Sequence, residues 1–305
     1  MKYYRAFSLN IYSEIEFPEL AAGFPDMPID LQISVGKTPD KLEGSDVLTR
    51  VRNQSRPGQF LINIHNIGRI YVENGNTILV DYKKEADRSF LKNYILTRAI
   101  SAALHQRHWT PIHASSIALN DKAILFAGHS GSGKSTTTSA FVKKGYPFIS
   151  DDICIIKKEA DNLYKVHHSY PQIRLWDDAL EMIADPKHNK DNPIGNKINK
   201  FSVKPSGDII SEPLEISHIY ILRTGPVDSE TLISMDGLEK LQELQSLTFA
   251  KSQLKGMGGI KEQFETMSYL IKNCAIKILN QPIVNRDIWR TIDFLEQDFN
   301  PKLVS

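Results

Sequence analysis

Short runs of alternating apolar and polar side chains occupy much of the first eighty residues. The runs "DLQISVG" (30–36) and "QFLINIHNIGRIYVENGNTILVDY" (59–82) show the period of two that is typical of half-buried β-strands. Asn74-Gly75 interrupts the second run, and this dipeptide favours a tight hairpin turn. Residues 37–58 carry prolines and glycines among charges, which predicts a loop. The front of the chain is therefore expected to be β-rich.

The hydrophobic period changes between residues 85 and 107. Apolar residues of "EADRSFLKNYILTRAISAALHQR" recur at intervals of three and four, which predicts a helix with one apolar stripe. Pro111 follows a few residues later, as expected beyond the end of a helix. We therefore expect a β-rich N-terminal region over residues 1–100, ending in this helix, and a second domain over residues 101–305.

Strand and helix patterns alternate in the second region. The runs "IHASSIAL" (112–119) and "KAILFAG" (122–128) predict two strands joined by a turn at Asn120-Asp121. A helix over about 134–144 is expected to end at Gly145. The alternation predicts a mixed α/β fold. Further strands are predicted at 146–150, 152–158, 163–168 and 217–224, and further helices at 236–248, about 260–279 and 286–297.

A glycine-rich loop, "GHSGSGKS" (128–135), matches the pattern G-x-x-x-x-G-K-[ST] at every fixed position. In this pattern glycines let backbone N–H groups approach phosphate oxygens, Lys134 adds a cation, and Ser135 offers a hydroxyl to Mg²⁺. The helix that follows favours a bound anion at its N-terminus. A loop that only turns the chain is the alternative, and the flanking strand and helix favour phosphate binding. The candidate nucleotide-binding residues are Gly128, His129, Ser130, Gly131, Ser132, Gly133, Lys134, Ser135 and Thr136.

An acidic pair, Asp151-Asp152, directly follows the strand predicted at 146–150. Ligands of α/β sheets collect beyond the carboxyl ends of the strands, so both carboxylates are expected beside the glycine loop. One carboxylate suits Mg²⁺ binding, and a second suits proton abstraction from an acceptor hydroxyl. The alternative is a solvated acidic turn, which the complete glycine loop upstream makes less favoured.

The composition of this chain of 305 residues limits the classes of partner that it is expected to bind. Thirty-seven Lys and Arg residues against 36 Asp and Glu residues leave a formal charge of +1, which argues against nucleic acid as a partner. No apolar run of about eighteen residues is present, and the first residues do not resemble a signal peptide. Cys154 and Cys274 are isolated, and no HExxH motif occurs, so no structural metal site is expected. The expected location is the cytoplasm, without a membrane partner.

Four features occur together over residues 110–180. They are "HAS" (113–115), a short hairpin, the glycine loop, and the Asp pair after one helix and one strand. In this combination the chain resembles the HPr kinase/phosphorylase family, whose P-loop fold is akin to that of bacterial phosphoenolpyruvate carboxykinase. The resemblance implies an α/β P-loop kinase domain of this type behind the smaller β-rich region. It also implies ATP and Mg²⁺ as cofactors.

The resemblance implies roles for individual residues. His113 matches a histidine near the family's active site, and Asp151 matches the carboxylate that deprotonates the acceptor serine. Ser135 and Asp152 match groups near the metal ion. Arg174, in "YPQIRLW" (170–176), matches the arginine of the family's E-I-R-G stretch. The implied catalytic residues are Asp151, His113, Lys134 and Arg174, and the implied metal ligands are Ser135 and Asp152.

Two departures from the family pattern separate this chain from the HPr enzymes. Gln172 occupies the position of the glutamate in E-I-R-G, and "RLWDDALEMI" replaces the glycine-rich signature used in phosphorolysis. The reverse, phosphorylase reaction is therefore not expected. The chain is most similar to a branch that phosphorylates lasso precursor peptides on a serine at or near the C-terminus. The β-rich front, "LHQRHWTPIHASS" (104–116) and "YPQIRLW" carry this likeness.

Three functions compete. The first is an ATP-dependent kinase of a serine in a peptide or small protein. The second is a kinase of an HPr-like protein or of a small-molecule hydroxyl, or a carboxykinase on the same scaffold. The third is a non-catalytic nucleotide sensor or a switch ATPase. The Asp pair disfavours the sensor, which has no need for a base beside the γ-phosphate. The sequence contains no NKxD motif, which disfavours a GTPase. The sequence leaves open the exact acceptor and whether the chain forms a homo-oligomer.

Overall fold

A computed structural model describes residues 2–183, 200–284 and 286–300. The chain divides into two compact units, residues 1–111 with 248–266, and residues 112–247 with 267–305. The first unit thus extends beyond residue 100, the boundary expected from the sequence, and takes in a segment far along the chain. Within this unit the side chain of His105 bonds to the carbonyl oxygen of Phe249, with Nε2 and O 2.9 Å apart. Contacts of this kind tie the end of the predicted helix to the later segment.

The first unit contains one sheet and a set of helices. Its strand order is β3-β1-β2-β4-β9-β8-β7-β6-β5, and α2 contacts both β8 and α6. The elements of this unit are β1 (Lys2–Ala6), β2 (Leu9–Ser13), β3 (Ala21–Ala22), β4 (Leu31–Val35), β5 (Leu48–Thr49), β6 (Asn53–Arg56), β7 (Gln59–Ile64), β8 (Gly68–Glu73), β9 (Thr77–Tyr82), α1 (Arg88–Tyr94), the π-helical stretch η1 (Ile95–Ala99), α2 (Ile100–Gln106) and α6 (Lys251–Met257).

The predicted β-rich front is present, with differences in detail. The Asn74-Gly75 turn joins β8 to β9, and both residues have the left-handed φ (49° and 68°) that such a turn requires. The expected loop over residues 37–58 contains β5 and β6. These strands are short and polar, so no alternating apolar pattern marks them in the sequence. The helix expected over 85–107 is divided into α1, η1 and α2.

The remaining elements of the chain build a second sheet, a small two-stranded sheet and their helices. The order of the larger sheet is β10-β14-β15-β18-β12-β11-β13, with β20 pairing with both β18 and β19. These elements are β10 (Thr110–Ile112), β11 (Ala114–Leu119), β12 (Lys122–Ala127), α3 (Lys134–Lys143), β13 (Phe148–Ser150), β14 (Cys154–Lys158), β15 (Tyr164–His167), β16 (Ile173–Trp176), α4 (Asp177–Ile183), β17 (Lys200–Val203), β18 (Leu214–Gly225), β19 (Thr231–Ser234), α5 (Gly237–Ser246), α7 (Ile260–Asn273), β20 (Ala275–Pro282) and α8 (Ile288–Phe299).

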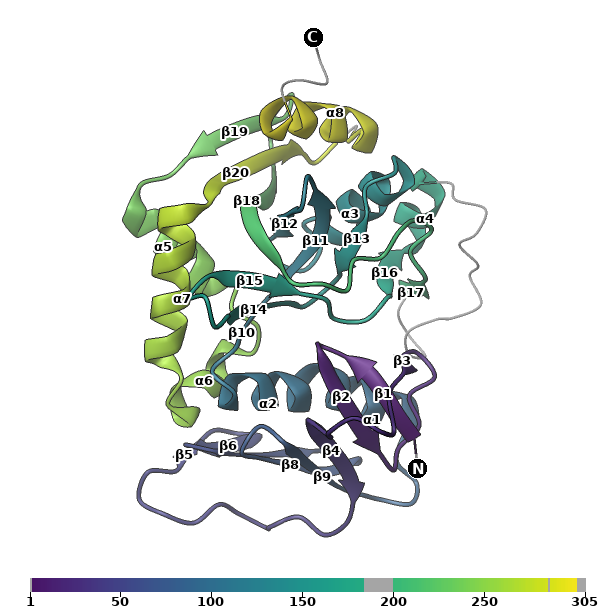
Figure 1. The fold of residues 1–305 in the computed structure, drawn as a ribbon, viewed down its shortest axis with the longest axis vertical. Helices are drawn as coiled ribbons and strands as arrows, with labels where there is room; N and C mark the ends of the chain where they lie inside the picture. Colours follow the sequence, from purple (N-terminus) through teal and green to yellow (C-terminus); the bar gives the residue numbers. More distant parts are fainter. Residues whose placement is uncertain (1, 184–199, 285, 301–305) are drawn as a thin grey trace. The chain divides into compact units, whose positions relative to one another are not determined.

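The second unit has three layers, with helices on both faces of the sheet (Figure 1). The central strand β12 explains why both faces of the sheet are covered. All its inner side chains are apolar, and successive ones point to opposite faces. Ala123 and Leu125 join a core with residues of α5 and α7, whereas Ile124 and Phe126 join a core with residues of α3, α4 and α8. The unit is therefore a mixed α/β fold, as the alternation of patterns predicts.

Strand directions bring several strand ends to one edge of this sheet. Strands β12, β18 and β20 are mutually parallel, and β11 lies antiparallel between β12 and β13. Strand β13 therefore runs in the same direction as β12, and the start of β11 meets the carboxyl ends of the other four strands. The predicted Asn120-Asp121 turn, with left-handed φ at both residues, makes the β11–β12 hairpin.

One predicted helix is wrong over its last residues. The helix expected over about 260–279 ends at Asn273, and the next residues form β20. This strand is buried on both faces, with Ile276 and Ile278 in one core and Leu279 in the other. An apolar run that is buried on both faces lacks a period of two, so periodicity does not distinguish it from a helix. Among the described residues, no helix is both long enough and apolar enough to cross a membrane.

Candidate active site

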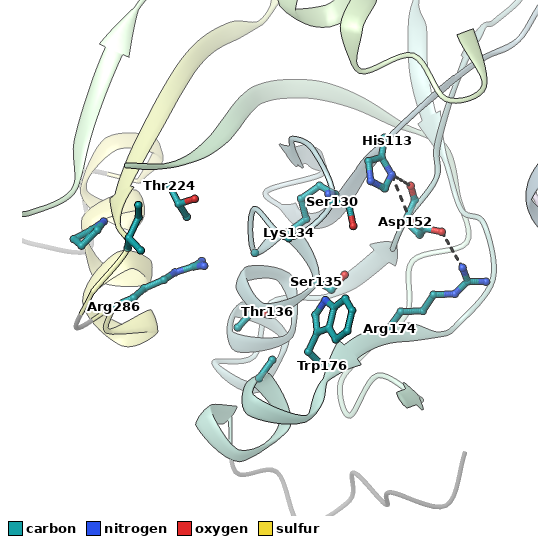
Figure 2. Close-up of a pocket in the computed structure, with 15 residues that line it drawn as sticks. His113, Ser130, Lys134, Ser135, Thr136, Asp152, Arg174, Trp176, Thr224 and Arg286 are labelled. Atoms are coloured by element: carbon teal, nitrogen blue, oxygen red, sulfur yellow. Dashed lines mark hydrogen bonds and ion pairs between the residues drawn. The ribbon is translucent and has the colours of Figure 1, made fainter. Parts of the chain in front are cut away.

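A cavity of about 570 Å³ opens at the edge where these strand ends meet (Figure 2). Its walls come from the glycine loop and the start of α3, the residue before β11, the turn after β13, the β16–α4 segment, and the ends of β18 and β20. The lining residues are His113, Ser130, Gly131, Gly133, Lys134, Ser135, Thr136, Asp152, Arg174, Trp176, Ala179, Thr224, Pro282, Ile283 and Arg286.

The glycine loop has a backbone that other residues do not readily adopt. Gly128 has a φ of 152°, and a Cβ there would lie 2.6 Å from the Ser132 hydroxyl oxygen and 2.8 Å from the Leu222 carbonyl oxygen. Gly133, which precedes α3, has a φ of 94°. The buried Lys134 ammonium donates to the carbonyl oxygens of Gly128 at 2.8 Å and His129 at 2.9 Å. The loop therefore wraps around the Lys134 ammonium group, a contact that the sequence pattern does not specify.

Asp151 is buried and accepts hydrogen bonds from three separate segments. The Ser135 hydroxyl donates to both its carboxylate oxygens, at 2.8 and 3.1 Å, and the Arg174 backbone N–H donates at 2.8 Å. The Ser115 hydroxyl donates to it as well. The sequence resemblance implies that Asp151 is the catalytic base, whereas this geometry joins it to Ser135, the expected metal-side hydroxyl.

Asp152 lines the cavity, and Asp151 does not. The Arg174 guanidinium donates to its Oδ2 at 3.0 Å, and the His113 Nδ1 atom lies 3.5 Å from its Oδ1 (Figure 2). Its φ of 68° is left-handed, a conformation that costs a non-glycine residue about 1–3 kcal/mol and is concentrated at functional sites. The side chain turned toward the cavity is therefore that of Asp152, which the sequence analysis assigns to the metal ion.

His113 is largely buried between the Lys134 ammonium and the Asp152 carboxylate. Burial lowers its pKa below the ordinary histidine value, the nearby Lys134 ammonium lowers it further, and the Asp152 carboxylate opposes both. The Nδ1 atom lies 3.0 Å from the Asp152 backbone carbonyl oxygen, which can only accept a hydrogen bond. Nδ1 therefore carries the proton in the neutral ring, and Nε2 carries the lone pair.

Arg174 links Asp152 to a tyrosine on the same segment. One guanidinium nitrogen contacts Asp152 and another donates to the Tyr170 hydroxyl at 3.0 Å. Burial opposes its charge, but the nearby Tyr170 hydroxyl and the Asp pair raise its pKa above the ordinary arginine value. The guanidinium is thus a permanent cation at this wall of the cavity. Gln172, which occupies the position of the family's glutamate, does not line the cavity.

Among the lining residues that the sequence analysis missed, two have large functional side chains, Arg286 and Trp176. Arg286 lies between β20 and α8, and a Cβ placed on Gly133 would collide with its guanidinium group. Its only sequence signal is a basic residue shortly after an apolar strand, in the position where ligands of α/β sheets collect. Trp176, at the end of β16, is 43% exposed. Only the quoted run "YPQIRLW" pointed to its neighbourhood.

The donor set suits a magnesium ion that arrives with phosphate groups. Among the described residues, no group of three or more His, Cys, Asp and Glu side chains is placed to hold a metal ion. Mg²⁺ at phosphoryl sites is held by one or two carboxylates together with phosphate oxygens and water. The Ser135 hydroxyl, the Asp151 carboxylate that is bonded to it and the Asp152 carboxylate at the cavity wall are such protein oxygens.

Comparisons with known proteins give likenesses to a protein family and to solved structures. A family model described as "SynChlorMet cassette protein ScmC" matches residues 79–191, which include the glycine loop, the Asp pair and Arg174. Among solved structures, the HPr(Ser) kinase/phosphatase from Coxiella burnetii is similar, with 13% sequence identity and a TM-score of 0.33. That match covers 64% of this chain and 99% of the Coxiella chain. No curated protein matches the sequence.

Proposed function

We propose that this protein is an ATP-dependent serine kinase that phosphorylates a lasso precursor peptide on a serine at or near its C-terminus. One observation carries the proposal: a phosphate-type glycine loop and a positioned carboxylate face the same cavity. Lys134 and Ser135 line one part of it, and Asp152 lines another with Arg174 and His113 (Figure 2).

Nucleotide binding uses the start of α3. Backbone N–H groups of the glycine loop and the helix N-terminus favour phosphate oxygens. The Lys134 ammonium, which bonds to loop carbonyl oxygens, transfers its hydrogen bonds to phosphate, and the Arg286 guanidinium adds a second cation. Ser135 and Asp151 would hold the protein side of a Mg²⁺ site, and the ion bound with ATP would supply charge neutralisation at the phosphates.

Phosphoryl transfer then requires a deprotonated acceptor. The serine oxygen bonds to the γ-phosphorus as the bond from that phosphorus to the β–γ bridging oxygen breaks, and ADP leaves. The serine proton passes to the Asp152 carboxylate, which Arg174 and His113 position. This division exchanges the roles that the resemblance implies for the two aspartates. It is supported by the hydrogen bonds that engage Asp151 with Ser135 and by the position of Asp152 at the cavity wall.

The choice of a peptide serine follows from chemistry and from the sequence resemblance. A carboxylate base suits a neutral hydroxyl acceptor, because phosphoryl transfer otherwise needs little proton chemistry from the protein. A flexible peptide end enters an open cavity without unfolding. The runs "LHQRHWTPIHASS" and "YPQIRLW" carry the likeness to the lasso-peptide branch.

The test is phosphorylation of serine-ended precursor peptides in the presence of ATP and Mg²⁺. We expect a product one phosphate heavier by mass spectrometry, and no product after the terminal serine is changed to alanine. Lys134→Ala should abolish transfer, whereas Lys122→Ala, at an exposed lysine paired with Glu215, should not. Returning the product with inorganic phosphate should leave it phosphorylated, since the phosphorolysis signature is absent.

Other outcomes select the competing functions. Phosphorylation of a small-molecule hydroxyl or of an HPr-like protein, with every peptide unmodified, would leave a kinase with a different acceptor. Binding of ATP without transfer to any of these acceptors would identify a nucleotide sensor.

A further inference from the structure

Trp176 presents a large aromatic ring to a cavity whose other functional groups are polar or charged. On β16 the side chains alternate: Ile173 and Leu175 are buried in the core with α3, whereas Arg174 and Trp176 line the cavity. Trp176 remains 43% exposed. A pleated strand therefore places an indole ring two positions from the guanidinium that contacts Asp152.

The Trp176 indole lies on the part of the cavity wall that the sugar and base of a bound nucleotide would reach. Thr136 follows Ser135 in the first turn of α3, and Thr136, Trp176 and the small Ala179 line the same cavity. In Figure 2 the indole lies next to this first turn, between Thr136 and Arg174. If the reacting phosphate lies near Asp152, the remaining phosphates follow the helix N-terminus, and the sugar and base continue beside the first turn.

We propose that Trp176 is the platform on which the purine base of the nucleotide stacks. The inference rests on the proposed nucleotide site and adds to it the residue that recognises the base. An indole offers a flat apolar face, and the stacking of a nucleobase on an aromatic side chain contributes substantially to binding. Ala179 on the adjoining α4 leaves room for a ring beside the indole. The competing occupant of this wall is an apolar side chain of the acceptor.

A pair of probes separates base recognition from phosphate recognition. ADP and inorganic pyrophosphate share a diphosphate, and only ADP carries a base. With Mg²⁺ present, Trp176→Ala should weaken ADP binding about tenfold in isothermal titration, and leave pyrophosphate binding unchanged. Trp176→Phe, which keeps an aromatic face, should weaken ADP binding about threefold at most. Lys134→Ala should weaken the binding of both probes, because it alters the phosphate site that ADP and pyrophosphate share.

Intrinsic fluorescence gives an independent reading. ADP should quench the emission of the parent protein and of Trp289→Phe, whereas pyrophosphate should not. The quenching by ADP should be absent from Trp176→Phe. If Trp176→Ala weakens ADP and pyrophosphate binding equally, or leaves ADP affinity unchanged, the assignment of Trp176 to the base is wrong. Trp176 would then contact the acceptor instead. Failure of the parent protein to bind pyrophosphate would instead contradict the phosphate site on which the inference rests.

Discussion

The Ser135 hydroxyl donates to both carboxylate oxygens of Asp151, at 2.8 and 3.1 Å, while the adjacent Asp152 faces the cavity. Two consecutive carboxylates thus have different surroundings. Asp151 is buried among hydroxyl and backbone donors, and Asp152 contacts the Arg174 guanidinium. This asymmetry makes their contributions separable by experiment.

The first prediction separates the two aspartates. Asp152→Asn should lower kcat by about 10²–10⁴-fold with little change in nucleotide affinity, the range expected for the loss of a general base. Asp151→Asn should weaken binding of Mg·ATP, and raising the Mg²⁺ concentration should restore part of the activity by mass action. Kinetics over a Mg²⁺ titration measure both effects, and Asp161→Asn, at an exposed turn, is the control. The opposite pattern would make Asp151 the base, as the sequence resemblance implies.

The second prediction concerns Arg174, whose guanidinium spans Asp152 and Tyr170. Arg174→Ala should reduce kcat by about 10²-fold and change nucleotide affinity less, because the lost contact positions the proposed base. Its backbone bond to Asp151 is retained in any substitution except proline. Arg174→Lys should recover only part of the loss, since an ammonium cannot reproduce a planar fork of donors. Tyr170→Phe, measured in parallel, should lower kcat by less than about tenfold. A loss of kcat equal to that of Arg174→Ala would assign Arg174 a structural role.

The third prediction concerns Arg286, which lies against Gly133 of the glycine loop. Under the proposed function, a cation at this point would complement charge on the transferring phosphoryl group, and arginines with that function contribute about 10³-fold or more to turnover. Arg286→Ala should therefore lower kcat by roughly 10³-fold in steady-state assays. Arg290→Ala is the matched control, because Arg290 is one turn further along and pairs with Glu230 outside the cavity. Similar losses in both variants would indicate damage to α8 rather than loss of a catalytic charge.

Local signals predicted the parts of the site that depend on neighbouring residues in the sequence. The Asn120-Asp121 turn and the glycine loop each require a particular backbone, so their residue types indicate them directly. The prediction that Asp151 and Asp152 lie beside the glycine loop rested on strand direction. It agrees with the parallel courses of β12 and β13, although β11 intervenes.

Contacts that depend on tertiary arrangement were not predicted. Arg286 reaches Gly133 only because β12, β18 and β20 are parallel neighbours, and no local pattern encodes that order. The different surroundings of the two aspartates were not predicted for a related reason. Adjacent residues point in different directions at a left-handed turn, and the φ of Asp152 cannot be read from its residue type. The strand β20 was missed because burial on both faces removes its alternation.

The last prediction concerns stability in the first unit. His105 on α2 is buried, and its Nε2–H donates to the Phe249 carbonyl oxygen at 2.9 Å. Burial lowers the pKa of this histidine to about 4, against an ordinary value of about 6.5 in the unfolded chain. Between these values the unfolded chain binds a proton that the folded protein does not. The free energy of unfolding should therefore fall as the pH drops below 6.5, and the decline from this residue should end near pH 4.

By pH 5 the share of His105 in this loss is about 2 kcal/mol. His105→Gln removes the titrating group, and its amide nitrogen can still reach the Phe249 carbonyl oxygen. In urea unfolding at pH 7.5 and pH 5, the stability difference between the two pH values should shrink by about 2 kcal/mol in this variant. His65→Gln, at an exposed histidine of the same unit, is the matched control for the substitution itself. An identical acid-induced loss in parent and His105→Gln would mean that His105 takes up its proton without leaving its buried position.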